Sequence, residues 1–104
     1  MIYLEDTVVE IEAGTTDDET AREIYRNLLV LYGTQTGEQA LDREFGIDIS
    51  ILDQPQEAAK ALLAAEFVRK TKRYEPRMRV MRVEWNQDNA RAGCIVPKVV
   101  VSFV

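Results

Sequence analysis

The stretch Tyr74-Glu75-Pro76-Arg77 separates a helical pattern before it from a strand-like pattern after it. Proline lacks the N–H that a continuing helix needs and pushes the preceding residue toward extended backbone angles, so a helix must end at about Tyr74. The corner sets a carboxylate and a guanidinium beside a rigid residue, and such groups form strong hydrogen bonds. Two interpretations stay open. Either Arg77 caps the helix or pairs with Glu75, since the helix dipole favours a cation there, or the corner contacts a partner.

The helix before the corner starts at Asp53-Gln54-Pro55, where a capping side chain precedes a proline suited to the first turn. Its predicted buried stripe is narrow and would let the helix lie close to a neighbour. That stripe consists of Ala58, Ala61, Leu62, Ala65 and Val68. The last turns carry Arg69, Lys70, Lys72 and Arg73, which is more cationic charge than capping requires.

The pattern after the corner predicts a β-hairpin. Met78 to Trp85 alternates so that Met81, Val83 and Trp85 share one face, with Val80 on the polar face. Residues 86–93 form a polar turn, and residues 95–104 return as the second arm. The core face of that arm is Ile95, Val99, Val101 and Phe103.

Residues 99–104 are uncharged and mostly β-branched, so an exposed edge strand there would be an aggregation hazard. Two explanations stay open. The segment is a central strand of its own sheet, or a partner chain adds a strand beside it or covers its second face.

The first half of the chain predicts a strand, a helix and a loop. Residues 7–12 alternate as a strand, and Thr16-Asp17-Asp18-Glu19 has the spacing of a capping box that begins a helix. The apolar stripe of this helix is Ala21, Ile24, Leu28 and Leu31, and Gly33 stands where a left-handed residue would end it. Residues 34–51 are expected to form a loop, with Phe45 anchored to the core and Gly46 allowing a turn.

These elements predict one α+β domain over residues 1–104. Two main helices pack on a small, mostly antiparallel sheet that ends in a C-terminal β-hairpin. A chain of 104 residues, 46% hydrophobic, supports one core. It has no apolar run long enough for a membrane helix and no start resembling a signal peptide, so a cytosolic protein is expected.

Residue usage argues against several classes of chemistry. A single cysteine, Cys94, cannot form an internal disulfide, and without histidine the usual metal sites and cysteine-protease arrangements are missing. Glycine-rich phosphate loops and nucleophile elbows are also missing. We therefore expect no enzyme activity, no cofactor and no metal. The alternative is a cell-wall-degrading enzyme in which Glu75 or Glu44 serves as glycosidase acid, beside a second carboxylate.

Charge is divided unequally along the chain. Residues 1–57 hold 14 Asp/Glu against 3 Lys/Arg, a net of −11, whereas residues 58–104 hold 4 against 10, a net of +6. The halves attract each other within one domain, or the molecule is polar and stacks against neighbours in an assembly. Residues 69–74 with Arg77, Arg79 and Arg82 also resemble a nucleic-acid patch in which Tyr74 stacks. The acidic first half argues against nucleic acid as a partner.

The order of these motifs resembles the baseplate wedge proteins of contractile phage tails, called lysozyme-like in older naming, with the related baseplate subunit of type VI secretion systems. The resemblance covers about residues 17–104. It is carried by the first helix, Gly37-Glu38, Glu44-Phe45-Gly46, the alanine-rich helix, and the Glu75-Pro76-Arg77 signature followed by Val80 and Val83. Arg43-Glu44 stands where the family often has a proline.

The resemblance implies a structural protein with the fold of the sheath subunit's inner domain. It implies a sheath initiator that joins the baseplate wedge to the first sheath ring in several copies around the tube, in a phage tail, a tailocin or a related contractile injection machine. The implied partners are the tail sheath protein and other wedge proteins, with no nucleic acid and no membrane. The implied location is the host cytoplasm during assembly, then the virion baseplate. The partner-binding residues would be Glu75, Pro76 and Arg77, with Arg73 and Arg79 beside them.

Overall fold

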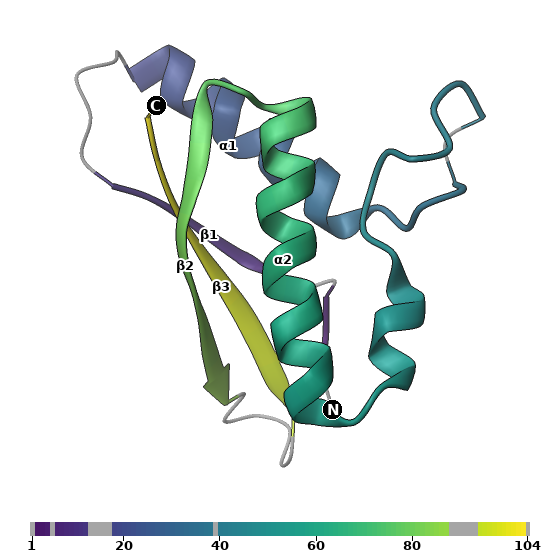
Figure 1. Ribbon diagram of the computed structural model, residues 1–104. Coiled ribbons are helices and arrows are strands. Elements are labelled where there is room, and N and C mark those ends of the chain that lie inside the picture. Colours follow the sequence, from purple (N-terminus) through teal and green to yellow (C-terminus); the bar gives the residue numbers. More distant parts are fainter. Residues whose placement is uncertain (1, 5, 13–17, 39, 88–93, 104) are drawn as a thin grey trace.

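The computed structural model describes residues 2–4, 6–12, 18–38, 40–87 and 94–103. Strand β1 spans Val8–Ile11, helix α1 Asp18–Gly33, the 3-10 helix η1 Ile49–Asp53, helix α2 Gln56–Tyr74, strand β2 Met78–Gln87 and strand β3 Ile95–Phe103. Both helices lie against the same face of one sheet, and a loop between α1 and η1 projects from the body (Figure 1). The α+β class expected from the sequence is confirmed.

The sheet has the strand order β1-β3-β2. Strand β3 is antiparallel to β2, with Val99 opposite Val83, and parallel to β1, with Val99 opposite Val9. The sheet is therefore mixed, and the antiparallel β2–β3 pairing is longer than the parallel β1–β3 pairing. The valine-rich segment is the central strand, and Val99, Val100 and Val101 are fully buried. The first of the two explanations for it is thus correct, and among the described residues β1 and β2 are the edge strands of the sheet. Val104 lies outside the described residues.

The core fills the space between the two helices and the face of β3 that carries Val99 and Val101. Its fully buried members include residues from α1, α2 and the loop that joins them. These are Ile24, Leu28, Leu31, Tyr32, Ile47, Leu63 and Phe67. The stripe expected for the first helix is confirmed at Ile24, Leu28 and Leu31 because their spacing of three and four places them on one face.

The buried face of α2 differs from the expected one. Ala58, Ala61, Leu62, Ala65 and Val68 are all exposed. The buried residues are instead Ala59, Leu63, Glu66, Phe67, Lys70 and Thr71. Two charged residues belong to this face, so a pattern read from apolar residues alone selected the wrong side of the helix.

Strand β2 contains a β-bulge that changes which residues face the core. Val80 is opposite Val101 and Arg82 is opposite Val100, so Met81 is the extra residue. As a result Val80, Val83 and Trp85 pack against the core, whereas Met81 is 44% exposed. The expectation that Met81 faced the core and Val80 the polar side was wrong, because strict alternation cannot include an inserted residue.

The ends of α1 show how it is joined to its neighbours. It begins at Asp18, and Thr16 and Asp17 of the expected capping box lie outside the described residues. Gly33 is the last helical residue and has no positive φ, so the expected left-handed cap is wrong. The hydroxyl of Thr34 instead donates to the carbonyl of Val30 at 2.6 Å.

Gly46 makes the turn expected of it, at a φ of 106°. A β-carbon there would lie 2.4 Å from the carbonyl oxygen of Thr34, so only glycine fits. The turn brings Ile47 into the core beside residues 34–36, where its N–H donates to the carbonyl of Thr34 at 2.7 Å. Residues 49–53 then form η1 and lead into α2. Of the expected polar turn, residues 88–93 lie outside the described part of the chain.

Candidate partner-binding site

The proline corner has the expected backbone. Helix α2 ends at Tyr74 and β2 begins at Met78. The N–H of Glu75 closes the last helical turn by donating to Thr71 at 2.8 Å, and the N–H of Met78 donates to the carbonyl of Glu75 at 3.0 Å. Pro76 has no N–H to donate, and its side chain is exposed. The corner therefore fixes the direction of the two charged side chains beside it.

Glu75 and Arg77 form a two-pronged ion pair. The Nε of Arg77 donates to Oε1 of Glu75 at 2.6 Å, and its Nη2 donates to Oε2 at 2.9 Å. Asn27 of α1 donates to the same carboxylate at 3.4 Å, and Glu23 lies 3.8 Å from Arg77. The hydrogen bonds from Arg77 lower the pKa of Glu75.

Burial separates the roles of these two residues. Glu75 is 4% exposed, whereas 45% of the Arg77 side chain is open to solvent. Of the pair, Arg77 is thus the member that can touch another molecule. Glu75 holds the guanidinium in one orientation, and an oriented guanidinium loses less conformational freedom on binding.

The other two expected residues lie apart from the corner. Arg73 turns toward the loop before η1, where it pairs with Glu44 and sits 5.2 Å from the centre of the Tyr74 ring. Its pKa is raised by the hydrogen bond to Glu44. Arg79 is on β2, opposite Ser102 of β3, and is exposed. The structure thus brings Glu75, Pro76 and Arg77 together and assigns Arg73 to a second cluster.

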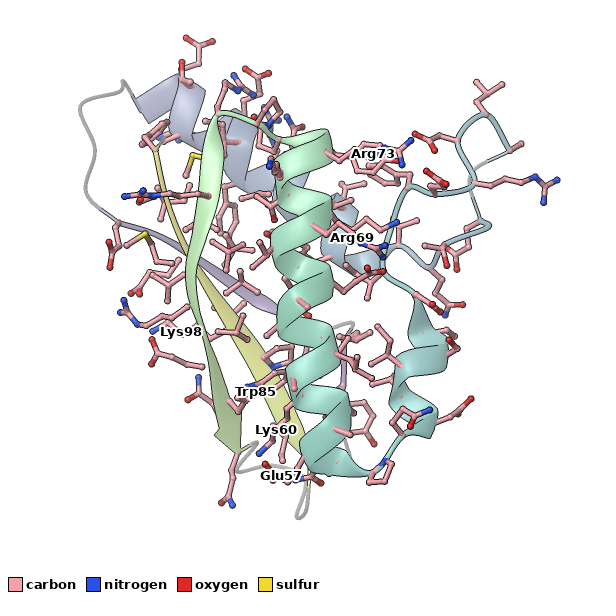
Figure 2. All side chains as sticks on the ribbon, viewed as in Figure 1. Glu57, Lys60, Arg69, Arg73, Trp85 and Lys98 are labelled. Atoms are coloured by element: carbon pink, nitrogen blue, oxygen red, sulfur yellow. The ribbon has the colours of Figure 1, made fainter. Side chains whose placement is uncertain are left out.

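That second cluster was not anticipated from the sequence. Figure 2 shows Arg69 and Arg73 on the side of α2 that faces the loop. Buried Glu66 accepts from the N–H of Asp48 at 3.0 Å and pairs with Arg69, while buried Lys70 donates to the carbonyl of Glu44. These groups surround a polar pocket of about 250 Å³, lined by Thr36, Arg43, Glu44, Asp48, Glu66, Arg69, Lys70 and Arg73.

The cluster holds the loop against α2. Three of its cations, Arg69, Lys70 and Arg73, are bound by carboxylates or a carbonyl of the same chain, and these contacts tie the loop to the helix. One signal in the sequence could have found it. Glu66 and Lys70 are four residues apart and fall on the same helical face as Leu63 and Phe67.

The outer face of the sheet carries ion pairs that join its strands. Arg82 of β2 lies 3.2 Å from Glu84 and 3.1 Å from Glu12, which follows β1, and Lys98 of β3 lies 3.6 Å from Glu10 of β1. Val100 lies between Glu10 and Arg82 in the strand register and is fully buried. Lys98 extends from the side of the sheet away from α2 (Figure 2).

The two free edges of the sheet differ in length. Strand β1 has four residues and β2 has ten. Along an edge strand, every second residue directs its N–H and C=O away from the sheet. Strand β2 therefore offers the longer row of backbone groups, and it begins directly after the Arg77 guanidinium.

No known family model, curated protein or solved structure matches this chain. The resemblance carried by the Glu75-Pro76-Arg77 signature thus stays a prediction. Within the described residues, no helix is both long enough and apolar enough to cross a membrane. The same residues contain no cluster of three or more acidic or cysteine side chains placed to hold a metal ion.

Proposed function

We propose that this protein is a non-enzymatic assembly component that joins the baseplate of a contractile injection machine to the first ring of its sheath. The free edge of β2 accepts an extended strand from the sheath protein, and Arg77 and Arg79 pair with carboxylates of that partner. Main-chain hydrogen bonds supply affinity in such strand addition, and the charges select the partner and the register.

One observation carries the proposal. A ten-residue edge strand begins immediately after a corner where a buried carboxylate orients a half-exposed guanidinium. The acceptor strand differs from the one suggested by the valine-rich sequence, because β3 is paired on both sides within its own sheet. The identity of the partners comes from the resemblance to baseplate wedge proteins.

The arrangement of cations supports a protein partner over nucleic acid. Arg69, Arg73 and Arg82 each have a carboxylate partner in the same chain. Phosphate binding would have to displace these carboxylates. A salt-dependent gel shift tests this alternative, and clearing of purified cell wall tests the muralytic one.

The deciding experiment is sheath assembly on baseplates that carry charge-reversed variants. Arg79→Glu is the cleanest change because this exposed side chain has no ion pair among the described residues. Arg77→Glu tests the corner itself but also sets three carboxylates together. We expect both variants to lower the yield of sheathed particles, and Arg22→Glu on α1 to leave it unchanged as a matched control.

Normal sheath yield with a stably folded Arg79→Glu and Arg77→Glu double variant would remove the site assignment. Hydrogen exchange gives a second measurement. Strand addition should slow exchange of β2 amides in the assembled particle, because it pairs groups that are free in the isolated protein.

A further inference from the structure

The loop between α1 and η1 forms a projecting finger, defined here as residues 36–38 and 40–44 (Figure 1). Its two sides are joined where the N–H of Gly37 donates to the carbonyl of Arg43 at 2.8 Å. Its base is joined where the N–H of Thr36 donates to Ile47 at 3.1 Å, and Lys70 and Arg73 of α2 bind Glu44. The finger is therefore held in a defined place by the body of the protein.

The finger carries a fully exposed apolar side chain. Leu41 has a relative exposure of 103%, the largest among the exposed large apolar residues. A single surface leucine is ordinary by itself. A leucine on a projection fixed by hydrogen bonds is different, because a pre-organised apolar anchor loses little freedom when it enters a pocket.

A pocket of suitable chemistry lies on the same chain, where η1 meets the start of α2. Its volume is about 340 Å³, and it is lined by Ile2, Leu52, Asp53, Gln54, Gln56 and Ala59. Ile2 and Ala59 are buried and give it an apolar floor, while exposed Asp53 gives its rim a negative charge. Arg43 of the finger, two residues from Leu41, is exposed and has no ion pair among the described residues.

We propose that the finger of one copy inserts Leu41 into this pocket of a second copy, with Arg43 facing Asp53. The finger and the pocket are different surfaces of the molecule, so the contact is head-to-tail and repeats from copy to copy into a ring or an open chain. The β2 edge takes no part, so this contact is independent of strand addition to the sheath protein.

Sedimentation equilibrium on the full chain, at concentrations up to about 1 mM, tests the contact because a single anchor gives weak association. We expect the wild-type protein to self-associate and Leu41→Asp to weaken association by about tenfold or more. Val68→Asp alters an exposed apolar residue outside the finger, on α2, and should leave the association unchanged. Circular dichroism checks that each variant is folded. A wild-type protein that stays monomeric throughout, or a Leu41→Asp variant that associates equally well, overturns the proposal.

A charge exchange tests the orientation. Arg43→Glu and Asp53→Arg should each weaken association, and the double variant should regain at least part of the loss because the attraction is restored with reversed signs. A double variant no better than the weaker single variant contradicts the pairing of Arg43 with Asp53.

Discussion

At the scale of single residues, the proline corner was predicted in its backbone but not in its burial. Pro76 forbids a continuing helix, so the end of α2 at Tyr74 follows from the sequence. The burial of Glu75 does not follow from the sequence in this way, because its carboxylate accepts a hydrogen bond from Asn27, 48 positions away along the chain. Local sequence therefore fixed the turn, and tertiary contacts decided which charged residue faces solvent.

Replacement of Glu75 by glutamine should destabilise the fold. The substitution removes the charge that accepts two hydrogen bonds from Arg77 and one from Asn27 in a buried place, and we expect a loss of about 1–3 kcal/mol. Urea unfolding measures it. Glu57→Gln is the control, since Glu57 is 86% exposed and its pair with Lys60 is of the weak surface kind. Equal midpoints for wild type and Glu75→Gln would refute a stabilising role.

The contribution of Glu75 should depend on pH. Its pKa is lowered in the folded state, so the folded protein releases the proton more readily than the unfolded chain. The stabilisation is present above the unfolded pKa, about 4.3, and is lost as pH falls through the lower folded value. We expect the difference in unfolding free energy between wild type and Glu75→Gln to shrink below about pH 4. A difference that is constant with pH would assign the effect to packing.

At the scale of elements, the buried faces of α2 and β2 were both predicted wrongly, because a regular pattern is interrupted in each. Glu66 and Lys70 lie on the buried face of α2, and the bulge at Met81 reverses the faces of β2. A charged residue can be buried when a partner pairs with it, but a hydropathy pattern does not show that partner. Nor does it show which residue of a strand is the extra one in a bulge. The element types and the buried stripe of α1 were predictable, whereas the faces that α2 and β2 turn toward the core were not.

The bulge in β2 can be checked with two neighbouring substitutions. Val80→Asp places a charge against the core and should cost more than about 2 kcal/mol. Met81→Asp changes an exposed residue and should cost less than about 0.5 kcal/mol. Chemical denaturation of the two variants gives the comparison. The reverse order of stabilities would restore strict alternation and remove the bulge.

The two helices are joined by a buried hydrogen bond that can also be tested. The hydroxyls of Tyr32 on α1 and Thr71 on α2 are 2.5 Å apart, and burial raises the pKa of Tyr32 to about 12. Tyr32→Phe leaves the Thr71 hydroxyl without this partner and should cost about 1–3 kcal/mol. Tyr25→Phe, at a 40% exposed position on the same helix, is the control.

Alkaline pH gives an independent measurement of the same contact. The unfolded chain ionises its tyrosines near pH 10, whereas folded Tyr32 keeps its proton to about 12. The wild-type protein should thus lose stability between these values, and Tyr32→Phe should lose less. Parallel curves for the two proteins would argue against burial of a neutral Tyr32.

At the scale of the whole molecule, the opposite charges of the two halves are joined within one domain. Among the described residues, five ion pairs link acidic residues before position 58 to basic residues after it, through Lys60, Arg73, Arg77, Arg82 and Lys98. This pairing supports the interpretation that the halves attract each other. Arg79 on β2 takes part in none of these pairs, and the proposed binding to the sheath protein depends on its exposed charge.

These links predict how stability responds to salt. Exposed ion pairs are screened as the Debye length falls, from about 10 Å at 0.1 M salt to about 3 Å at 1 M. We expect the urea midpoint to fall as sodium chloride is raised across this range, and to fall less in Arg82→Gln, which lacks its two partners. A midpoint that does not fall with salt would mean that attraction between the halves contributes little to stability.

The position of β3 at the centre of the sheet has a consequence for the kinetics of folding. Strands β2 and β3 are near neighbours in sequence and can pair early, whereas β1 must close a loop of about 90 residues, from Val8 to Lys98, before it pairs. Until β1 pairs, the backbone groups along that edge of β3 have no strand beside them. Synthesis of many copies at once thus favours strand exchange between chains in which β1 has not yet paired with β3.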